Sequence, residues 1–218
     1  MIRALRILVL FLLPLICSFV GLRWSGALRV REVRIHPTRY VAVEKLTGEI
    51  LGANILRLDL EPLRQRLLAD PRVLGVVIRV NIFCLRVEIE VRERSPLVAV
   101  VLQDGRKVWV DQEGVILEEA EEGWVRGVAA EEGRVSQEVV EAALAWMRLP
   151  LGIREKYPVL DVSQGEAVAP GTPALLFGAI CQVPKKLGIL KELWRAGLLD
   201  GYSVVDMRFG DLVILKKR

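Results

Sequence analysis

Residues 85–92 read LRVEIEVR, and this stretch decides the fold of the chain around it. Aliphatic side chains occupy every second position, and charged side chains occupy the positions between them. Because successive side chains of a β-strand point to opposite faces, the pattern predicts a strand with one buried and one solvated face.

Four patterns upstream of this strand predict the rest of a small domain. Residues 30–35 alternate and stop at His36-Pro37, residues 43–51 and 60–68 each place aliphatic side chains on one helical face, and residues 73–80 alternate again. The order strand, helix, helix, strand, strand indicates a small sheet with two helices on one face. Its free edge is expected at residues 30–35 or at residues 85–91, depending on the strand order.

A second unit is expected from Pro96 onward. Asp104-Gly105 lies between two strand-like runs and is typical of a hairpin turn. One predicted helix follows the N-cap residue Ser136, and another begins at Pro184. The predicted strands cover residues 97–102, 107–111, 115–117, 159–163, 175–177, 203–209 and 211–215, the last two being separated by Gly210.

The N-terminus carries a charge-free apolar run at residues 7–22. At the helical rise it covers about 24 Å, short of the roughly 30 Å hydrocarbon core. Arg6 and Arg23 can snorkel and Trp24 suits the membrane interface, so residues 7–27 are predicted to form a transmembrane anchor. A cleaved signal peptide is the first alternative, and a buried core helix is the second. With the anchor retained, residues 1–6 form a short cytoplasmic tail and the bulk of the chain lies outside the cytoplasmic membrane.

The net charge of +4 does not indicate nucleic-acid binding. Six arginines but only one glutamate fall in residues 1–34, so the remainder of the chain is close to neutral. The basic character therefore belongs to the anchor region. Of the three cysteines, Cys17 lies in the predicted anchor, and a disulfide between Cys84 and Cys181 is left open.

Enzymatic chemistry is the weakest reading of the sequence. The single histidine, His36, stands beside a proline at a strand end, where an exposed turn residue is favoured over a catalytic base. Glu88 and Glu90 share a strand face with Arg86 and Arg92, which favours cross-paired ions over a catalytic carboxylate pair. Neither metal-ligand spacing nor a glycine-rich phosphate loop is present. We predict no catalysis, no cofactor or metal, and no small-molecule substrate.

Several motifs together resemble the FtsQ/DivIB family of single-pass bacterial cell-division proteins. They include Val91-Arg92-Glu93-Arg94-Ser95-Pro96, Val110-Asp111-Gln112-Glu113-Gly114-Val115-Ile116 and Val205-Asp206-Met207-Arg208-Phe209. The family's usual Arg-x-Trp-Pro is replaced here by Asn81-Ile82-Phe83-Cys84. The resemblance implies an α+β chain. It has an N-terminal transmembrane helix, a POTRA-like β-α-α-β-β domain at residues 29–95, and a mixed FtsQ-type β domain with a C-terminal edge strand at residues 96–218.

The resemblance also implies a function. Members of this family hold small bitopic division proteins of the FtsB and FtsL type outside the membrane, at the septum, and help to coordinate septal peptidoglycan synthesis. A POTRA-type component of a secretion or envelope-assembly system is the alternative, and an enzyme acting on envelope polymers comes third.

Residues 206–215 read DMRFGDLVIL and are the expected binding edge, where a partner strand can satisfy open backbone groups. The resemblance assigns partner contact to Asp206, Arg208 and Phe209. Core packing of Phe209, and an internal ion pair between Asp206 and Arg208, are the alternatives. The β-formers of the expected edge are Leu212, Val213 and Ile214.

Overall fold

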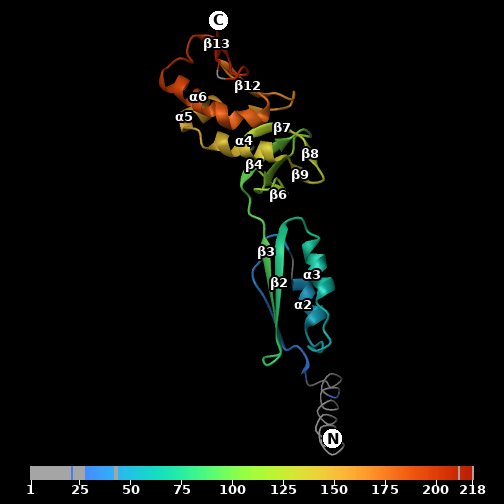
Figure 1. The fold of residues 1–218 in the computed structure, drawn as a ribbon. Helices are drawn as coiled ribbons and strands as arrows, with labels where there is room; N and C mark the ends of the chain where they lie inside the picture. Colours follow the sequence, from blue (N-terminus) through green and yellow to red (C-terminus); the bar gives the residue numbers. More distant parts are fainter. Residues whose placement is uncertain (1–20, 22–27, 42–43, 211, 218) are drawn as a thin grey trace, which may run out of the picture. The chain divides into compact units, whose positions relative to one another are not determined.

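The computed structural model describes residues 21, 28–41, 44–210 and 212–217. The chain divides into two compact units, a first that ends at Glu93 and a second that begins at Arg94 (Figure 1). Apart from Gly21, the predicted anchor at residues 7–27 lies outside the described residues, as do its flanking side chains. None of the helices within the described ranges has the length and apolar character needed to cross a bilayer.

The first unit has the element order that the sequence predicts. Its three strands form one sheet in the order β1-β3-β2, with β1 parallel and β2 antiparallel to β3. The elements are β1 (Glu32–Ile35), α2 (Glu44–Ile50), α3 (Glu61–Leu68), β2 (Val73–Asn81) and β3 (Arg86–Glu93).

The core of the first unit lies between the sheet and its two helices. Val87 and Ile89 of β3 are fully buried, and they belong to one cluster with Ile50 of α2 and with Leu63 and Leu67 of α3. Each such aliphatic side chain stabilises the fold by about 1.5–3 kcal/mol. Both helices therefore cover the same face of the sheet, which is the face that the alternation of residues 85–92 marks as apolar.

The opposite face of β3 carries ion pairs across the strands. Arg86 Nη2 lies 2.7 Å from Glu32 Oε2 on β1, and Glu90 Oε2 lies 3.5 Å from Arg79 Nη2 on β2. Arg92 Nε approaches the other oxygen of Glu90 at 3.5 Å. The prediction of cross-paired ions on this face is confirmed.

Of the two alternatives for the free edge of the first unit, residues 30–35 are confirmed, because β1 stands at one end of the sheet. The alternative at residues 85–91 is wrong, because β3 is the central strand, and Ile89 aligns with Ile35 on one side and with Ile78 on the other. Alternation shows which face of a strand is buried, but it does not show how many neighbours the strand has. The free edges of this sheet are β1 and β2.

The second unit is built on one large mixed sheet. Its strand order is β14-β13-β12-β11-β10-β7-β4-β5-β6, and β8 with β9 forms a separate small hairpin. The strands are β4 (Val98–Leu102), β5 (Lys107–Val110), β6 (Ile116–Glu119), β7 (Val125–Val128), β8 (Ala130–Glu131), β9 (Arg134–Val135), β10 (Leu160–Asp161), β11 (Ala167–Ala169), β12 (Ala174–Gly178), β13 (Tyr202–Asp206) and β14 (Ile214–Lys217).

Helices pack on this sheet and complete its core. They are α4 (Gln137–Met147), α5 (Leu151–Lys156), the 3-10 helix η2 (Ile180–Gln182) and α6 (Val183–Arg195). Helix α4 contacts β4, β7 and α6, and Figure 1 shows α4 and α6 lying across the strands. Trp146 of α4 is fully buried and meets Phe177 of β12 edge to face, with ring centroids 5.9 Å apart. The predicted hairpin at Asp104-Gly105 joins β4 and β5.

Helix α4 starts where the sequence predicts, with Ser136 as its N-cap. The hydroxyl oxygen of Ser136 accepts a hydrogen bond from the Val139 backbone N–H at 3.4 Å. We expect Ser136→Ala to lower the free energy of unfolding by about 1 kcal/mol. Urea unfolding of the full chain in detergent, followed by tryptophan fluorescence, measures this loss. Ser136→Asp keeps an acceptor at the N-cap and should stay close to wild type, so an equal loss in both variants would contradict the capping role.

The C-terminal strands differ from the prediction for residues 203–209 and 211–215. β13 ends at Asp206 and β14 begins only at Ile214, with which Asp206 is aligned in antiparallel register. The segment between them is a connection in which Gly210 has a φ of +60°, a backbone conformation that favours glycine. Of residues 206–215, the expected binding edge, only Ile214 and Leu215 lie in β14.

Candidate functional site

β14 is an open strand edge. It stands at one end of the large sheet and pairs with β13 on its inner side. On its outer side, no strand in the described ranges pairs with it. Its outward backbone N–H and C=O groups are therefore available to an incoming strand.

Apolar side chains are exposed at this edge and just before it. Phe209 is 53% exposed, Leu212 70% and Ile214 51%. Val213 and Leu215 turn the other way and pack against the core, so the chain alternates between buried and exposed positions here. The alternative in which Phe209 packs in the core does not hold. We call β14 together with Phe209 and Leu212 the edge surface.

Asp206 and Arg208 shape the connection that leads into β14. The backbone N–H and Nε of Arg208 each donate to Asp206 Oδ1 at 3.0 Å, and Nη2 donates to Oδ2 at 2.8 Å. Nη1 of Arg208 donates to Glu166 Oε2 at 3.2 Å, and the guanidinium lies 5.7 Å from the centroid of the Phe209 ring. The alternative of an internal ion pair therefore describes these two residues, and their part in the edge surface is to position Phe209.

The ion pair has a consequence for pH dependence. Hydrogen bonds from Arg208 hold the pKa of the Asp206 carboxyl below its ordinary value, against the opposing effect of burial. A carboxyl whose pKa is lower in the folded chain stabilises that state at pH values above its unfolded pKa. This stabilisation is lost as the pH falls through the folded pKa.

We therefore expect the effect of Asp206→Asn on stability to depend on pH. The variant should be less stable than the wild type at neutral pH, and the difference should shrink as the pH falls below about 4. Urea unfolding of both full-length proteins in detergent across this range measures it. A difference that stays constant down to the lowest pH would show that the ionised carboxylate of Asp206 does not stabilise the connection.

The two ends of the large sheet differ in character. At the β14 end, Lys216 and Lys217 are exposed beside the apolar side chains. At the β6 end, the backbone N–H of Ile116 donates to the carbonyl of Gly133 at 2.9 Å, so the β8–β9 hairpin covers the start of that strand. Covering an edge protects it from pairing with another chain. The β14 edge has no comparable cover among the described residues.

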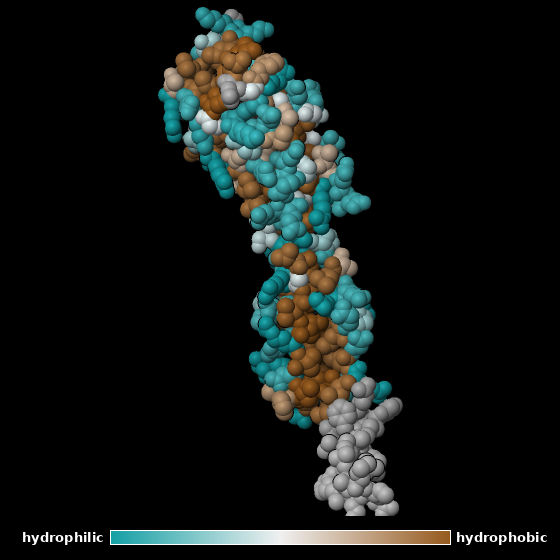
Figure 2. Space-filling model, in the orientation of Figure 1, coloured by the Kyte–Doolittle hydropathy of each residue, from teal (hydrophilic) through white to brown (hydrophobic). Residues whose placement is uncertain are grey.

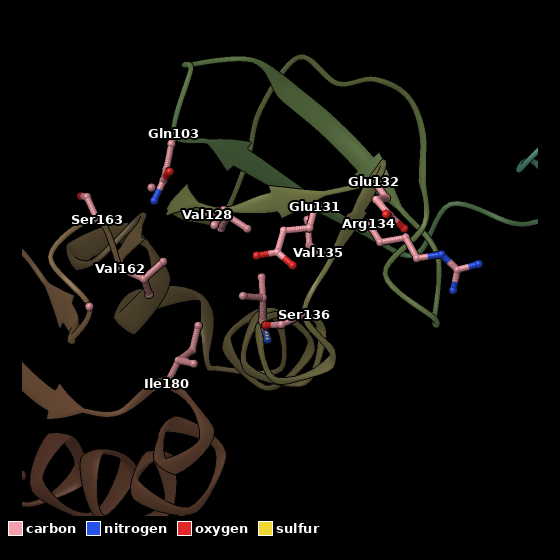
Figure 3. A pocket seen from close by; sticks show the side chains of 14 residues that line it. Gln103, Val128, Glu131, Glu132, Arg134, Val135, Ser136, Val162, Ser163 and Ile180 are labelled. Carbon is pink, nitrogen blue, oxygen red and sulfur yellow. Dashed lines mark hydrogen bonds between the residues drawn. The ribbon is translucent and has the colours of Figure 1, made fainter.

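An open cleft of about 770 Å³ lies elsewhere in the second unit, beside the β8–β9 hairpin. Figure 3 shows Val128, Val162 and Ile180 among the apolar side chains that line it, and Glu131 and Ser163 among the polar ones.

Ser163, one of the polar residues that line this cleft, is paired with a carboxylate that is a weak base. Ser163 Oγ donates a short hydrogen bond to the Asp161 carboxylate, which also pairs with Arg126. Burial opposes ionisation of Asp161, but hydrogen bonds from Ser163 and Arg126 outweigh it and leave the pKa below its ordinary value. A carboxylate with a lowered pKa is a poor general base near neutrality. No cluster of metal-binding side chains occurs in the part of the chain that the structure describes.

The edge surface, as defined above, includes none of the other candidate residues from the sequence. Arg6, Arg23 and Trp24 are outside the described residues. His36 is exposed immediately after β1. Cys84 and Cys181 are exposed and free, so the disulfide that the sequence left open is not formed.

Two residues that shape the site are not marked by any pattern in the sequence. Glu166 binds Arg208 from a distant segment, and buried Lys186 of α6 donates to the Phe177 carbonyl at 2.8 Å next to Gly178. A side-chain Cβ at Gly178 would come within 3.3 Å of the Arg208 side chain, so glycine leaves the room that Arg208 occupies. These contacts depend on strand order, which local sequence does not encode.

No protein-family model matches the chain, and no curated protein is significantly similar to it.

Proposed function

We propose that the chain is a non-catalytic, single-pass scaffold of the bacterial division machinery, of the FtsQ/DivIB type. In this proposal it holds small bitopic proteins of the FtsB and FtsL type outside the cytoplasmic membrane, at the septum. The observation that carries the proposal is the open edge of β14 with exposed Phe209, Leu212 and Ile214 beside it. A surface of this kind suits the capture of an extended segment better than it suits turnover of a substrate.

The edge surface also suggests what the bound segment is like. A strand added beside β14 gains main-chain hydrogen bonds, and its side chains lie next to those of Ile214 on the exposed face. Exposed Lys216 and Lys217 on the same strand favour acidic side chains in the partner. A segment with alternating apolar residues and nearby acidic ones is therefore the expected ligand.

Membrane attachment completes this proposal. The predicted anchor at residues 7–27 would tether both units to one bilayer, and a bitopic partner held in the same bilayer would meet the edge surface at high effective concentration. Through such an assembly the chain would help to place septal peptidoglycan synthesis, without cofactor or turnover of its own.

A second candidate is a POTRA-type component of a secretion or envelope-assembly system. The observation that favours it is the open β2 edge of the first unit, because an extended client segment could pair there.

Localisation separates the two candidates. A fluorescent protein fused to the N-terminus should form a band at midcell in dividing cells, and depletion of the native chain should give filaments. Uniform fluorescence around the envelope with normal division would overturn the division proposal and favour the secretion component.

A further inference from the structure

The turn between β2 and β3 exposes apolar side chains at one end of the first unit. Phe83 is fully exposed and Ile82 is about half exposed, and both stand at the tip of the hairpin. Within the first unit, the Phe83 side chain therefore gains none of the stabilisation that burial gives an aromatic side chain. Neighbouring exposed apolar residues of this kind mark a contact surface.

Backbone hydrogen bonds attach this tip to the point where the chain enters the unit. The N–H of Arg31 donates to the Leu85 carbonyl at 2.8 Å, and the N–H of Gly52 donates to the Val30 carbonyl at 2.9 Å. The entering segment therefore lies between the hairpin turn and the α2–α3 connection. Figure 1 shows both turns at the same end of the first unit, and in Figure 2 apolar side chains reach this end. Leu51, in the second turn, is also exposed.

The predicted membrane segment ends directly before this entry point. The carbonyl of Leu28 already accepts a hydrogen bond from the Ile55 N–H at 2.8 Å, so the folded unit starts one residue after the predicted span ends at residue 27. Even a fully extended chain from residue 27 to Arg31 covers only about 14 Å. The headgroup layer on each side of the hydrocarbon core is about 5–7 Å thick. The hairpin tip must therefore lie close to the bilayer surface.

Charge at this end suits a phospholipid surface. Arg29 and Arg31 are exposed in the entering segment. Glu32, the nearest acidic side chain in sequence, is engaged by Arg34 and Arg86. Basic side chains next to apolar ones bind an interface that carries anionic headgroups.

We propose that the β2–β3 hairpin tip is a second membrane contact, in which Ile82 and Phe83 enter the boundary between headgroups and acyl chains while Arg29 and Arg31 bind the headgroups. The proposal rests on the anchor of the proposed function. Contact at both the anchor and the tip would restrict rotation of the first unit about the anchor. Docking of a soluble partner at the tip is the competing explanation, and it predicts no quenching of a label at the tip by lipid-borne nitroxides.

The three native cysteines supply the test. Full-length variants that retain only one of Cys17, Cys84 and Cys181, the others being changed to serine, are labelled with the fluorophore NBD. They are then reconstituted into vesicles of phosphatidylethanolamine and phosphatidylglycerol. Lipids carrying a nitroxide at a shallow or a deep acyl position quench labels at matching depths. We expect the label on Cys84, next to Phe83, to shift its emission to the blue and to be quenched by the shallow nitroxide.

Two controls are a label at the far end of β2 and a change of the two apolar side chains at the tip. Leu74→Cys in a chain without the native cysteines places the label near the other end of β2, at an exposed apolar position, and should not be quenched. The double substitution of Ile82 and Phe83 by aspartate should abolish quenching at Cys84 and leave quenching at Cys17 unchanged. If Cys17 is quenched but Cys84 is not, or if Leu74→Cys is quenched equally, the tip proposal is wrong and the anchor stands. If Cys17 itself is not quenched, the anchor fails and the proposed function fails with it.

Discussion

Ile214→Asp is expected to weaken capture of an FtsB-type partner by about 30-fold or more, the loss typical of a hot-spot residue at an interface centre. Ile214 is half exposed on the open strand, so the change leaves the core of the second unit intact. In the complex, however, a carboxylate would be desolvated beside the partner's apolar side chains. Binding of the extracytoplasmic segment of the partner to the full chain in nanodiscs measures the loss.

A matched substitution tests whether the position matters or only the charge. Leu151 is equally apolar and more than half exposed, but it lies on α5, beside Trp124 and Val159. Leu151→Asp should leave partner affinity unchanged, and Phe209→Ala should weaken it. If Ile214→Asp and Phe209→Ala both bind like the wild type, capture at the edge surface is wrong.

Asp111→Ala is expected to lower the free energy of unfolding of the second unit by about 1–3 kcal/mol for each buried backbone N–H that loses its acceptor. Asp111 is buried, and its Oδ2 lies 2.6 Å from Arg94 Nη1. Its Oδ1 accepts hydrogen bonds from the backbone N–H groups of Glu113 at 2.9 Å and Val115 at 2.8 Å. In the variant, the backbone N–H groups of Glu113 and Val115 lose the Asp111 carboxylate as their acceptor, and the largely buried Arg94 loses one of its ion-pair partners.

Glu113→Ala is the control for this prediction. Glu113 binds the same Nη1 of Arg94 at 2.9 Å, but its own side chain is 57% exposed. Its loss should cost less than about 1 kcal/mol. Urea unfolding in detergent gives the free energy of unfolding of the full-length Asp111→Ala and Glu113→Ala variants. Equal losses in the two variants would show that the burial of Asp111 adds nothing to stability.

Local patterns predict much of the fold because they report burial directly. The alternation of residues 85–92 predicts β3, and the cap at Ser136 predicts α4. Strand β7 is not predicted from the sequence, because it is short and contains Gly127, a residue type that is disfavoured in strands. Helix α5 has only six residues after Pro150, too few for a helical period to show.

The binding edge is predicted in outline but not in its limits. Residues 206–215 contain enough β-formers to read as a strand pair, whereas the structure interrupts them between Asp206 and Ile214. The hydrogen bonds from Arg208 to the Asp206 side chain compete with ladder formation, as local side-chain contacts of aspartate often do. The contribution of Glu166 could not be foreseen, since it depends on how distant segments meet in the sheet.

A photo-crosslinking amino acid in place of Ile214 tests the central claim most directly. In dividing cells, irradiation should link the full chain to a small bitopic protein of the FtsB type, identified by mass spectrometry of the adduct. The same amino acid in place of Leu151 should give no such product. Absence of this adduct at position 214, or its equal formation at position 151, would contradict capture of a division protein at the edge surface.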